Sequence, residues 1–168
     1  MTDTYHLDTW LWLPAPRPDV FAFFSDAHNL ERITPPFLEF RVITAPPIAV
    51  SHGTRIDYRL RLRGIPLRWT SEITQWEPPE RFVDAQRRGP YAEWIHTHMF
   101  EQRDDGTMVR DHVRYRLRGP LVVSRLVNRL LVAPDTTAIF EFRQHALSDL
   151  FASGGRARIG PVELRTLT

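Results

Sequence analysis

The chain has 168 residues, of which 42% are hydrophobic and 25% are charged, as is typical of a single globular domain with its own core. It contains no cysteine, which excludes disulfides, thiolate nucleophiles and cysteine-ligated metal centres. The formal net charge is +2 and every basic side chain is an arginine, so the charge balance gives little support for a polyanionic partner.

The N-terminal segment predicts a strand followed by two short helices. Residues alternate between apolar and polar over 5–13, which is the period of a half-buried strand. In "DVFAFFSDAHNLERITPP", Asp19 is a suitable N-cap for a first helix, and Ser25 or Asp26 for a second. A further strand is expected over 37–44.

The middle of the chain predicts a series of antiparallel hairpins. Runs of alternating residues are separated by the turn sequences "RGIP", "EPPE", "RGPY" and "DDGT". The predicted strands cover residues 55–63, 67–76, 81–88, 92–103 and 108–117.

After residue 120 the apolar residues change to a helical period. "LVVSRLVNRLLVA" carries an apolar stripe, which we interpret as a lid over a pocket, and Pro134 is expected to interrupt the helix. A longer helix is predicted over 135–152, ended by two glycines. We therefore expect one domain over 1–152 and a flexible tail over 153–168.

These elements indicate an α+β fold of the helix-grip type. A long C-terminal helix covers only one face of an antiparallel sheet of six to seven strands, so the curved sheet must wrap around it. Two short helices follow the first strand. A cavity between helix and sheet is the expected result.

Several motifs resemble one family. "VFAFFSDAHNLERITPPFLEFRV" and "IFEFRQHAL..LF" are similar to the N-terminal helical part and the C-terminal helix of the START-like, or SRPBCC, superfamily. The sheet pattern resembles a bacterial ligand-binding branch labelled polyketide cyclase/dehydrase-like or cell-division-inhibitor-like. Its matching residues are Trp69, Ile73, Trp76, Pro78, Pro79, Phe82, Asp84, Gln86, Gly89, Pro90, Tyr91, Trp94, His96, His98, Phe100, Gly106, Thr107, Asp111, Val113 and Tyr115.

The resemblance covers about residues 5–152 and implies a small-molecule pocket, although the family has no agreed substrate. The chain lacks a glycine-rich nucleotide loop, Gly-x-Ser-x-Gly and His-Glu-x-x-His, so kinases, serine hydrolases of that type and metzincins are poor candidates.

Hairpin register predicts which polar side chains meet. In "WIHTHMF", His96 and His98 point to one face of a strand. A turn centred on Asp105-Gly106 would pair Phe100 with Asp111, His98 with Val113 and His96 with Tyr115. A turn centred on Gly89-Pro90 would place Asp84 near His96 and Gln86 near Trp94.

This inward-facing polar set allows three interpretations. His96 and His98 with Asp84 or Asp111 could hold a metal, but the predicted register sets Asp111 opposite Phe100 and away from the histidines. His96, Asp84 and Tyr115 could carry out acid–base catalysis. The favoured interpretation is a satisfied polar network that lines a cavity. We expect no metal or other cofactor.

The predicted function is binding of a hydrophobic or aromatic small molecule, and the alternative is a cofactor-independent cyclase, dehydratase or hydrolase that uses the Asp84–His96 pair. Arg143 could hold a ligand carboxylate, but a structural ion pair is favoured. The candidate ligand-binding residues are Tyr58, Trp69, Gln86, Trp94, His96, His98, Phe100, Asp111, Arg143 and Leu147.

The expected binding partners and the expected cellular location are inferred from motifs that the sequence lacks. The arginine-rich strand faces resemble a solvated sheet surface, so no nucleic-acid partner is expected, and the oligomeric state stays open. No run of about 18 apolar residues predicts a membrane span. The N-terminus lacks the pattern of a secretion signal, so we expect a cytoplasmic protein.

Overall fold

The structure is a computed structural model that describes residues 3–167. Its first half contains β1 (Thr4–Leu13), α1 (Arg17–Ser25), η1 (Ala27–Ile33), η2 (Pro36–Leu38), β2 (Arg41–Val42), β3 (Arg55–Leu62) and β4 (Ile65–Glu77). Its second half contains β5 (Arg81–Arg88), β6 (Glu93–Arg103), β7 (Gly106–Arg116), α2 (Leu121–Val127), η3 (Asn128–Val132), α3 (Ala133–Leu150), η4 (Ala152–Gly154), β8 (Arg158–Ile159) and β9 (Glu163–Leu167).

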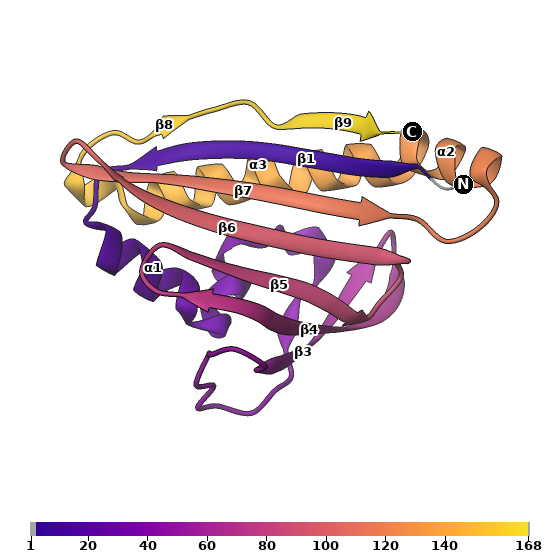
Figure 1. Cartoon of the computed structure of the whole chain (residues 1–168), viewed down its shortest axis with the longest axis horizontal. Helices are drawn as coiled ribbons and strands as arrows, with labels where there is room; N and C mark the ends of the chain where they lie inside the picture. The colour runs from indigo at the N-terminus through magenta and orange to yellow at the C-terminus, as the bar shows by residue number, and fades with distance from the viewer. Residues whose placement is uncertain (1–2, 168) are drawn as a thin grey trace.

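The strands form one curved antiparallel sheet in the order β2-β3-β4-β5-β6-β7-β1-β8, and β9 also pairs with β1. The helix α3 runs behind β1 and β7, while β3, β4 and β5 curve away from it (Figure 1). This arrangement confirms the predicted helix-grip architecture. The longer strands number six, and β2, β8 and β9 extend the sheet at its edges.

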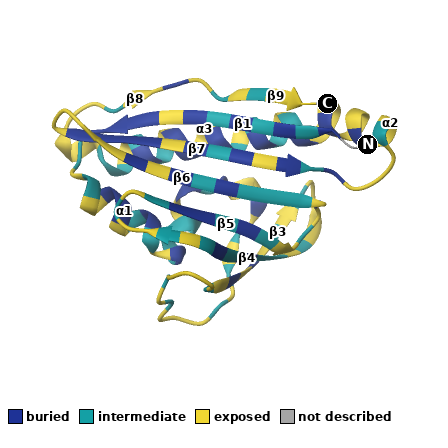
Figure 2. Ribbon diagram, viewed as in Figure 1, coloured by how far each residue is buried: buried dark blue, intermediate teal, exposed yellow. Residues whose placement is uncertain are grey.

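Burial alternates along the central strands, as Figure 2 shows, because one face of the sheet packs inward. Six fully buried aliphatic side chains join β1, β7 and α3. They are Leu7, Leu11, Leu13, Val109, Val113 and Leu147, each 0–1% exposed. Burying a side chain of this size stabilises the fold by about 1.5–3 kcal/mol, so these contacts fix α3 against the sheet.

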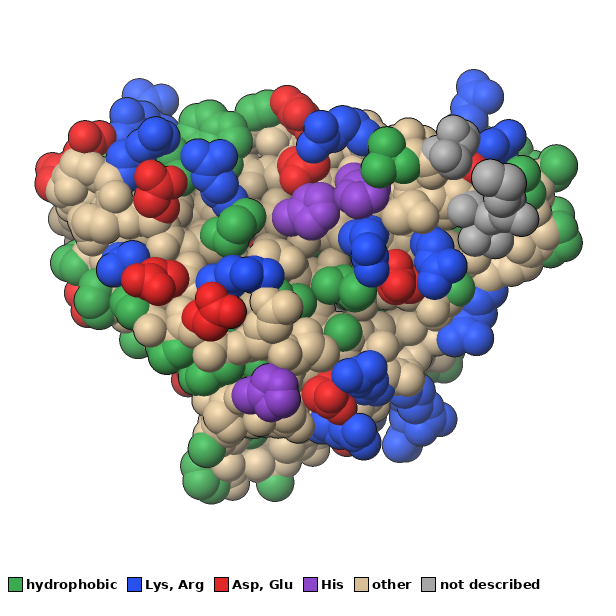
Figure 3. Space-filling view, viewed as in Figure 1, with side chains coloured by type: hydrophobic (Ala, Val, Ile, Leu, Met, Phe, Trp, Pro, Cys, Tyr) green, Lys and Arg blue, Asp and Glu red, His purple; other side chains and the backbone are tan. Residues whose placement is uncertain are grey.

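The outer face of the sheet carries arginines mixed with acidic side chains (Figure 3). Glu72 pairs with both Arg55 and Arg87 at 2.7 and 2.8 Å, and Glu93 pairs with Arg114 at 3.1 Å. Several of the arginines on this face are therefore matched locally, as expected of a solvated surface.

The β6–β7 register differs from the sequence prediction by two residues. The hairpin turns at Asp104 and Asp105, so that Arg103 pairs with Gly106 and His98 lies opposite Asp111. Asp104 takes the left-handed conformation, φ 56°, which a short polar side chain tolerates better than most. A shift of two residues keeps every side chain on its predicted face. The objection that Asp111 lies away from the histidines is therefore wrong.

The β5–β6 register places Asp84 opposite His96, as predicted. The paired residues end at Ala85 and Ile95, so Gln86 does not pair with Trp94. Its side-chain amide instead donates to the backbone carbonyl of Tyr91 at 3.0 Å and accepts the Tyr91 N–H at 3.3 Å.

The C-terminal helix is continuous from residue 121 to 150, although Pro134 was expected to interrupt it. The turn just before the proline, η3, is a π-helix, in which the Ala133 N–H bonds to the carbonyl of Asn128, five residues back. Because proline cannot donate the usual helical bond, a widened turn at this position lets the helix continue through it.

The apolar stripe of α2 and η3 faces outward instead of covering the cavity. Its members are Val122, Val123, Leu126, Val127, Leu130 and Leu131, and they are 36–79% exposed. The side chains that this segment buries include Ser124 and Asn128, both under 9% exposed. The lid interpretation is therefore wrong.

The expected flexible tail is instead paired with β1. β8 lies beside Leu11 and Trp12, and β9 pairs with residues 4–8. The outer edge of β1 would otherwise expose unpaired backbone groups, and the tail covers it. Between the two strands, Gly160 lies so close to the Trp10 ring that any side chain would clash. Across residues 3–167, no helix is both long and apolar enough to cross a membrane.

Candidate ligand-binding site

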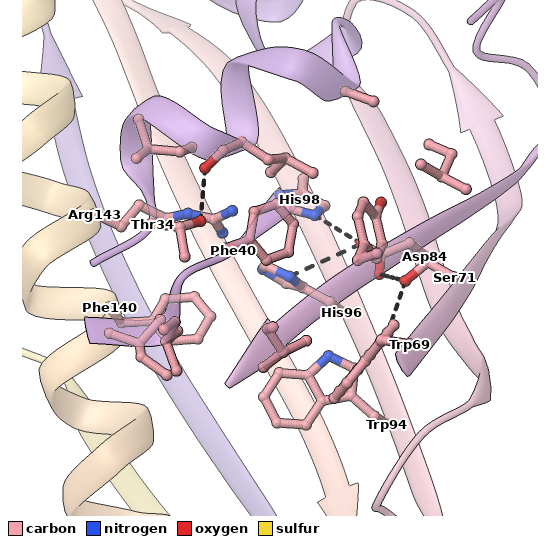
Figure 4. Close-up of a pocket in the computed structure, with 18 of the residues that line it drawn as sticks. Thr34, Phe40, Trp69, Ser71, Asp84, Trp94, His96, His98, Phe140 and Arg143 are labelled. Atoms are coloured by element: carbon pink, nitrogen blue, oxygen red, sulfur yellow. Dashed lines mark hydrogen bonds and ion pairs between the residues drawn. The ribbon is translucent and has the colours of Figure 1, made fainter. Parts of the chain in front are cut away.

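A cavity of about 210 Å³ lies between the sheet, α3 and the short helices η1 and η2. Aliphatic and aromatic side chains make up most of its wall, and polar groups gather on one side (Figure 4). Seven of the sequence-predicted residues line it: Tyr58, Trp69, Asp84, Trp94, His96, His98 and Arg143. A mostly apolar cavity with a few convergent polar groups is the common form of a small-molecule site.

The other predicted residues do not line the cavity. Phe100 and Leu147 belong to the core, where they are 2% and 0% exposed. Gln86 is held by the backbone of Tyr91, as described above. Tyr115 donates its hydroxyl to Asn128 at 2.8 Å, and Asp111 lies behind the two histidines.

Several residues of the cavity wall were not predicted from the sequence. Ser71 accepts a hydrogen bond from the Trp69 indole at 3.1 Å and donates one to Asp84 at 3.2 Å. Its signal was a small polar residue on the same strand face as Trp69 and Ile73. Thr34 and Phe40 come from the irregular segment around η2, which has no periodic signal.

Two imidazoles lie side by side between two carboxylates. The ring centroids of His96 and His98 are 3.7 Å apart. Asp111 Oδ1 is 2.8 Å from His96 Nε2 and 2.9 Å from His98 Nδ1, although the second contact lacks hydrogen-bond geometry. On the cavity side, Asp84 Oδ2 is 3.0 Å from His98 Nε2 and 3.9 Å from His96 Nδ1.

This arrangement drives the two imidazole pKa values apart. Burial and the neighbouring His98 lower the pKa of His96 to about 4. Burial opposes the charge on His98 as well, but Asp111 and Asp84 outweigh it and raise the pKa of His98. At neutral pH, His96 is therefore neutral, whereas His98 holds its proton to a higher pH than a free imidazole does.

Both carboxylates remain ionised. Burial alone would raise the pKa of Asp111 and of Asp84, but the two histidines hold both values below the usual one, that of Asp111 most strongly. When His98 is protonated, the cluster of Asp84, Asp111, His98 and Arg143 carries two negative and two positive charges. A buried cluster of charged side chains is tolerated when its positive and negative charges balance.

Asp84, His96 and His98 also have the composition of a two-histidine, one-carboxylate metal site, with one ligand atom each within 4.8 Å of the others. A divalent cation there would have to displace the proton on His98 and lie near Arg143. Because the four charged groups already balance, we interpret the cluster as a self-neutralised polar wall.

Comparisons of this chain with known protein families and solved structures agree with this fold. A family model described as "Polyketide cyclase / dehydrase and lipid transport" matches residues 13–137. Among solved structures, a norcoclaurine synthase point mutant from Thalictrum, in complex with a transition-state analogue, has a TM-score of 0.66 at 16% identity and covers 91% of this chain and 97% of that one.

Two bacterial structures are similar in the same way. Protein CV1439 from Chromobacterium violaceum has a TM-score of 0.64 at 15% identity, covering 87% of this chain and 96% of that one. A START superfamily protein from Mycobacterium smegmatis has a TM-score of 0.61 at 10% identity, covering 87% and 99%. At these identities the likeness concerns the fold. No curated protein matches the sequence.

Proposed function

Because the chain belongs to the polyketide cyclase/dehydrase and lipid transport family, we propose that it binds a hydrophobic or aromatic small molecule in the cavity between the sheet and α3. The observation that carries the proposal is the wall itself, which is apolar and aromatic over most of its area and polar on one side. Such a site takes up an apolar body and orients it through a few hydrogen bonds.

The aromatic side of the cavity suits a flat or extended ligand. Trp69 and Trp94 meet edge to face, with ring centroids 5.5 Å apart, and Tyr91 packs against both. Rings held in this way offer a rigid apolar surface to a ligand. Burial raises the pKa of the Tyr58 phenol, so its hydroxyl stays protonated.

Native mass spectrometry of the purified protein, beside its denatured spectrum, tests the proposal. We expect an added mass of a few hundred daltons that is lost on denaturation. Ligands identified in this way should then quench tryptophan fluorescence on titration. The quenching should weaken in Trp94→Phe, whereas Trp10→Phe serves as the matched control because Trp10 is 36% exposed. A ligand-free mass together with no quenching by any of a panel of apolar compounds would contradict binding.

A second candidate is acid–base catalysis by a cofactor-independent cyclase, dehydratase or hydrolase. One observation favours it: two adjacent cavity-lining imidazoles have pKa values displaced in opposite directions, as in sites that hold an acid beside a base. The acid would be His98, oriented by Asp84, and not the Asp84–His96 pair alone. Tyr115 lies off the cavity and is left out of this set.

Turnover separates the two candidates. The ligand found by mass spectrometry is incubated with wild type and with His98→Gln, and products are followed by chromatography. Catalysis predicts product formation that His98→Gln loses while binding persists. An unchanged ligand in both samples would leave binding as the function.

A further inference from the structure

Arg143 is the charged residue of α3 that lines the cavity. The residue is 9% exposed, and its guanidinium points from the helix toward the cavity and the polar wall (Figure 4). It follows Phe140 by one turn, and its guanidinium carbon lies 5.4 Å from the centre of that ring. Burying an arginine is costly unless its donors find acceptors.

The guanidinium of Arg143 lacks hydrogen-bond acceptors among the described residues. Among residues 3–167, its nearest acidic partner is Asp111, with Nη1 and Oδ1 3.9 Å apart, and no hydrogen bond from Arg143 is formed. Two other ion-paired arginines of the chain, Arg125 and Arg63, use both arms of the fork. Arg125 donates to Asp3 at 2.6 and 3.0 Å, and Arg63 donates to Asp135 at 3.0 and 2.9 Å.

The nearby carboxylates are already occupied. Asp111 is engaged by both imidazoles, and Asp84 accepts from His98 and Ser71. The histidines thus take the acceptors that a structural role for Arg143 would require. The structural ion pair expected from the sequence is therefore long and incomplete.

The charges that face the cavity are unequal. Among the residues that line it, Arg143 carries a permanent positive charge, the raised pKa of His98 favours a second one, and Asp84 is the acidic side chain. Asp111 lies behind the imidazoles and outside the lining. The cavity wall therefore presents more positive than negative charge to a ligand, next to an otherwise apolar surface.

We propose that Arg143 binds a carboxylate of the ligand, so that the cavity takes an amphipathic carboxylic acid whose apolar or aromatic body lies against the tryptophan side. This inference rests on the proposed ligand-binding function and specifies its ligand class. A planar guanidinium matches a carboxylate through two parallel hydrogen bonds, whereas an alcohol or a ketone would satisfy one arm.

The test uses two matched pairs of probes: dodecanoic acid with 1-dodecanol, and 2-naphthoic acid with 2-naphthylmethanol. Dissociation constants are measured by calorimetry at pH 7. We expect wild type to bind at least one acid about tenfold or more tightly than its alcohol. Arg143→Gln should lose that preference and keep the affinity for the alcohol, and Arg143→Lys should retain part of it because it keeps the charge without the fork.

Arg129→Gln is the matched control, because Arg129 is an exposed arginine of the same continuous helix. Its preference should equal that of wild type. Thermal unfolding of each variant checks that it folds, and the preference of wild type is itself a readout that needs no variant. Equal binding of acids and alcohols by wild type would overturn the carboxylate proposal and leave the ligand-binding function standing. Binding of none of the four probes would count against both.

Discussion

Two regions of this molecule reverse the usual distribution of polar and apolar side chains. The polar cluster on β5, β6 and β7 buries His96, His98 and Asp111 and covers most of Asp84. The segment formed by α2 and η3 exposes six large aliphatic side chains and buries polar ones. The first region pairs its buried charged groups with each other, whereas the second leaves its apolar face without cover from any described residue. In these two regions, whether a side chain is buried depends more on the hydrogen-bond and ion-pair partners available to it than on its hydropathy.

The difference lies in what holds each region in place. In the cavity wall, the strand register sets Asp111 beside both imidazoles, so pairing and position arise together. On the helix, Asn128 accepts the Tyr115 hydroxyl at 2.8 Å, and this bond turns the polar side of the helix toward β7. The apolar stripe then has to face outward.

The largest expected effect on stability comes from removing the Asp111 carboxylate beside the two histidines. Asp111→Ala leaves His98 as a buried cation with one carboxylate and His96 without its 2.8 Å partner. We expect the free energy of unfolding, measured by urea denaturation at pH 7, to fall by about 3–5 kcal/mol. Glu101→Ala is the control on the neighbouring strand, since its ion pair with Arg110 is long and exposed, and it should change stability by less than about 0.5 kcal/mol. Similar losses in both variants would show that the contacts of Asp111 with the two imidazoles stabilise the fold no more than an exposed ion pair does.

The next effect is the pH response of the two histidines. The lowered pKa of His96, about 4, means that the unfolded chain takes up a proton there between pH 6.5 and 4 that the folded chain refuses. His96 thus makes the fold lose stability as pH falls through that window. The raised pKa of His98 acts in the other sense: its contribution is present below pH 6.5 and is lost as pH rises through its folded-state pKa.

NMR titration of the imidazole nitrogens checks this assignment, with His96→Gln and His98→Gln used to identify the signals. At pH 6 we expect one neutral and one protonated ring. The excess stability of wild type over His98→Gln should also shrink between pH 6 and pH 9. Two rings that titrate together near pH 6.5 would contradict the coupled arrangement.

The smallest expected effect is a difference in stability between substitutions on the exposed and the buried face of the α2–η3 segment. Leu126, which is 57% exposed, should tolerate replacement by Gln with a change below about 0.5 kcal/mol. Asn128→Ala should cost about 1–3 kcal/mol, because it leaves the buried Tyr115 hydroxyl without its acceptor. Urea denaturation of the two variants gives the comparison directly. A larger loss in Leu126→Gln would mean that the stripe is covered in the folded protein.

The sequence predicted the elements better than it predicted their contacts. Residues 81–88 were expected as a strand and form β5 with the same bounds, because the turn sequences "EPPE" and "RGPY" mark its two ends. The turn "DDGT" offers two neighbouring positions for a two-residue tip, and the choice between them decides whether Asp111 meets Phe100 or His98. Periodicity could show that both lie on one face, but it could not resolve that choice.

The same limit applies to the helix and to Arg143. A helical period shows which residues of 121–131 share a side, but not which side the fold turns inward. The long distance from Arg143 to Asp111 depends on both imidazoles reaching that carboxylate first. Competition of this kind among side chains from three elements leaves no trace in local sequence.

The position of β1 has a consequence for synthesis on the ribosome. β1 pairs with β7, β8 and β9, so each of its partners is translated about a hundred residues or more after it. A nascent chain that has reached β6 can form the hairpins from β3 onward, but it holds β1 with neither neighbour. The cavity then lacks α3, and its histidines and carboxylates are hydrated. Because α3 and β9 follow all the cavity strands in the chain, the charged wall becomes enclosed only after those strands have been translated, and the chain can first retain a ligand then.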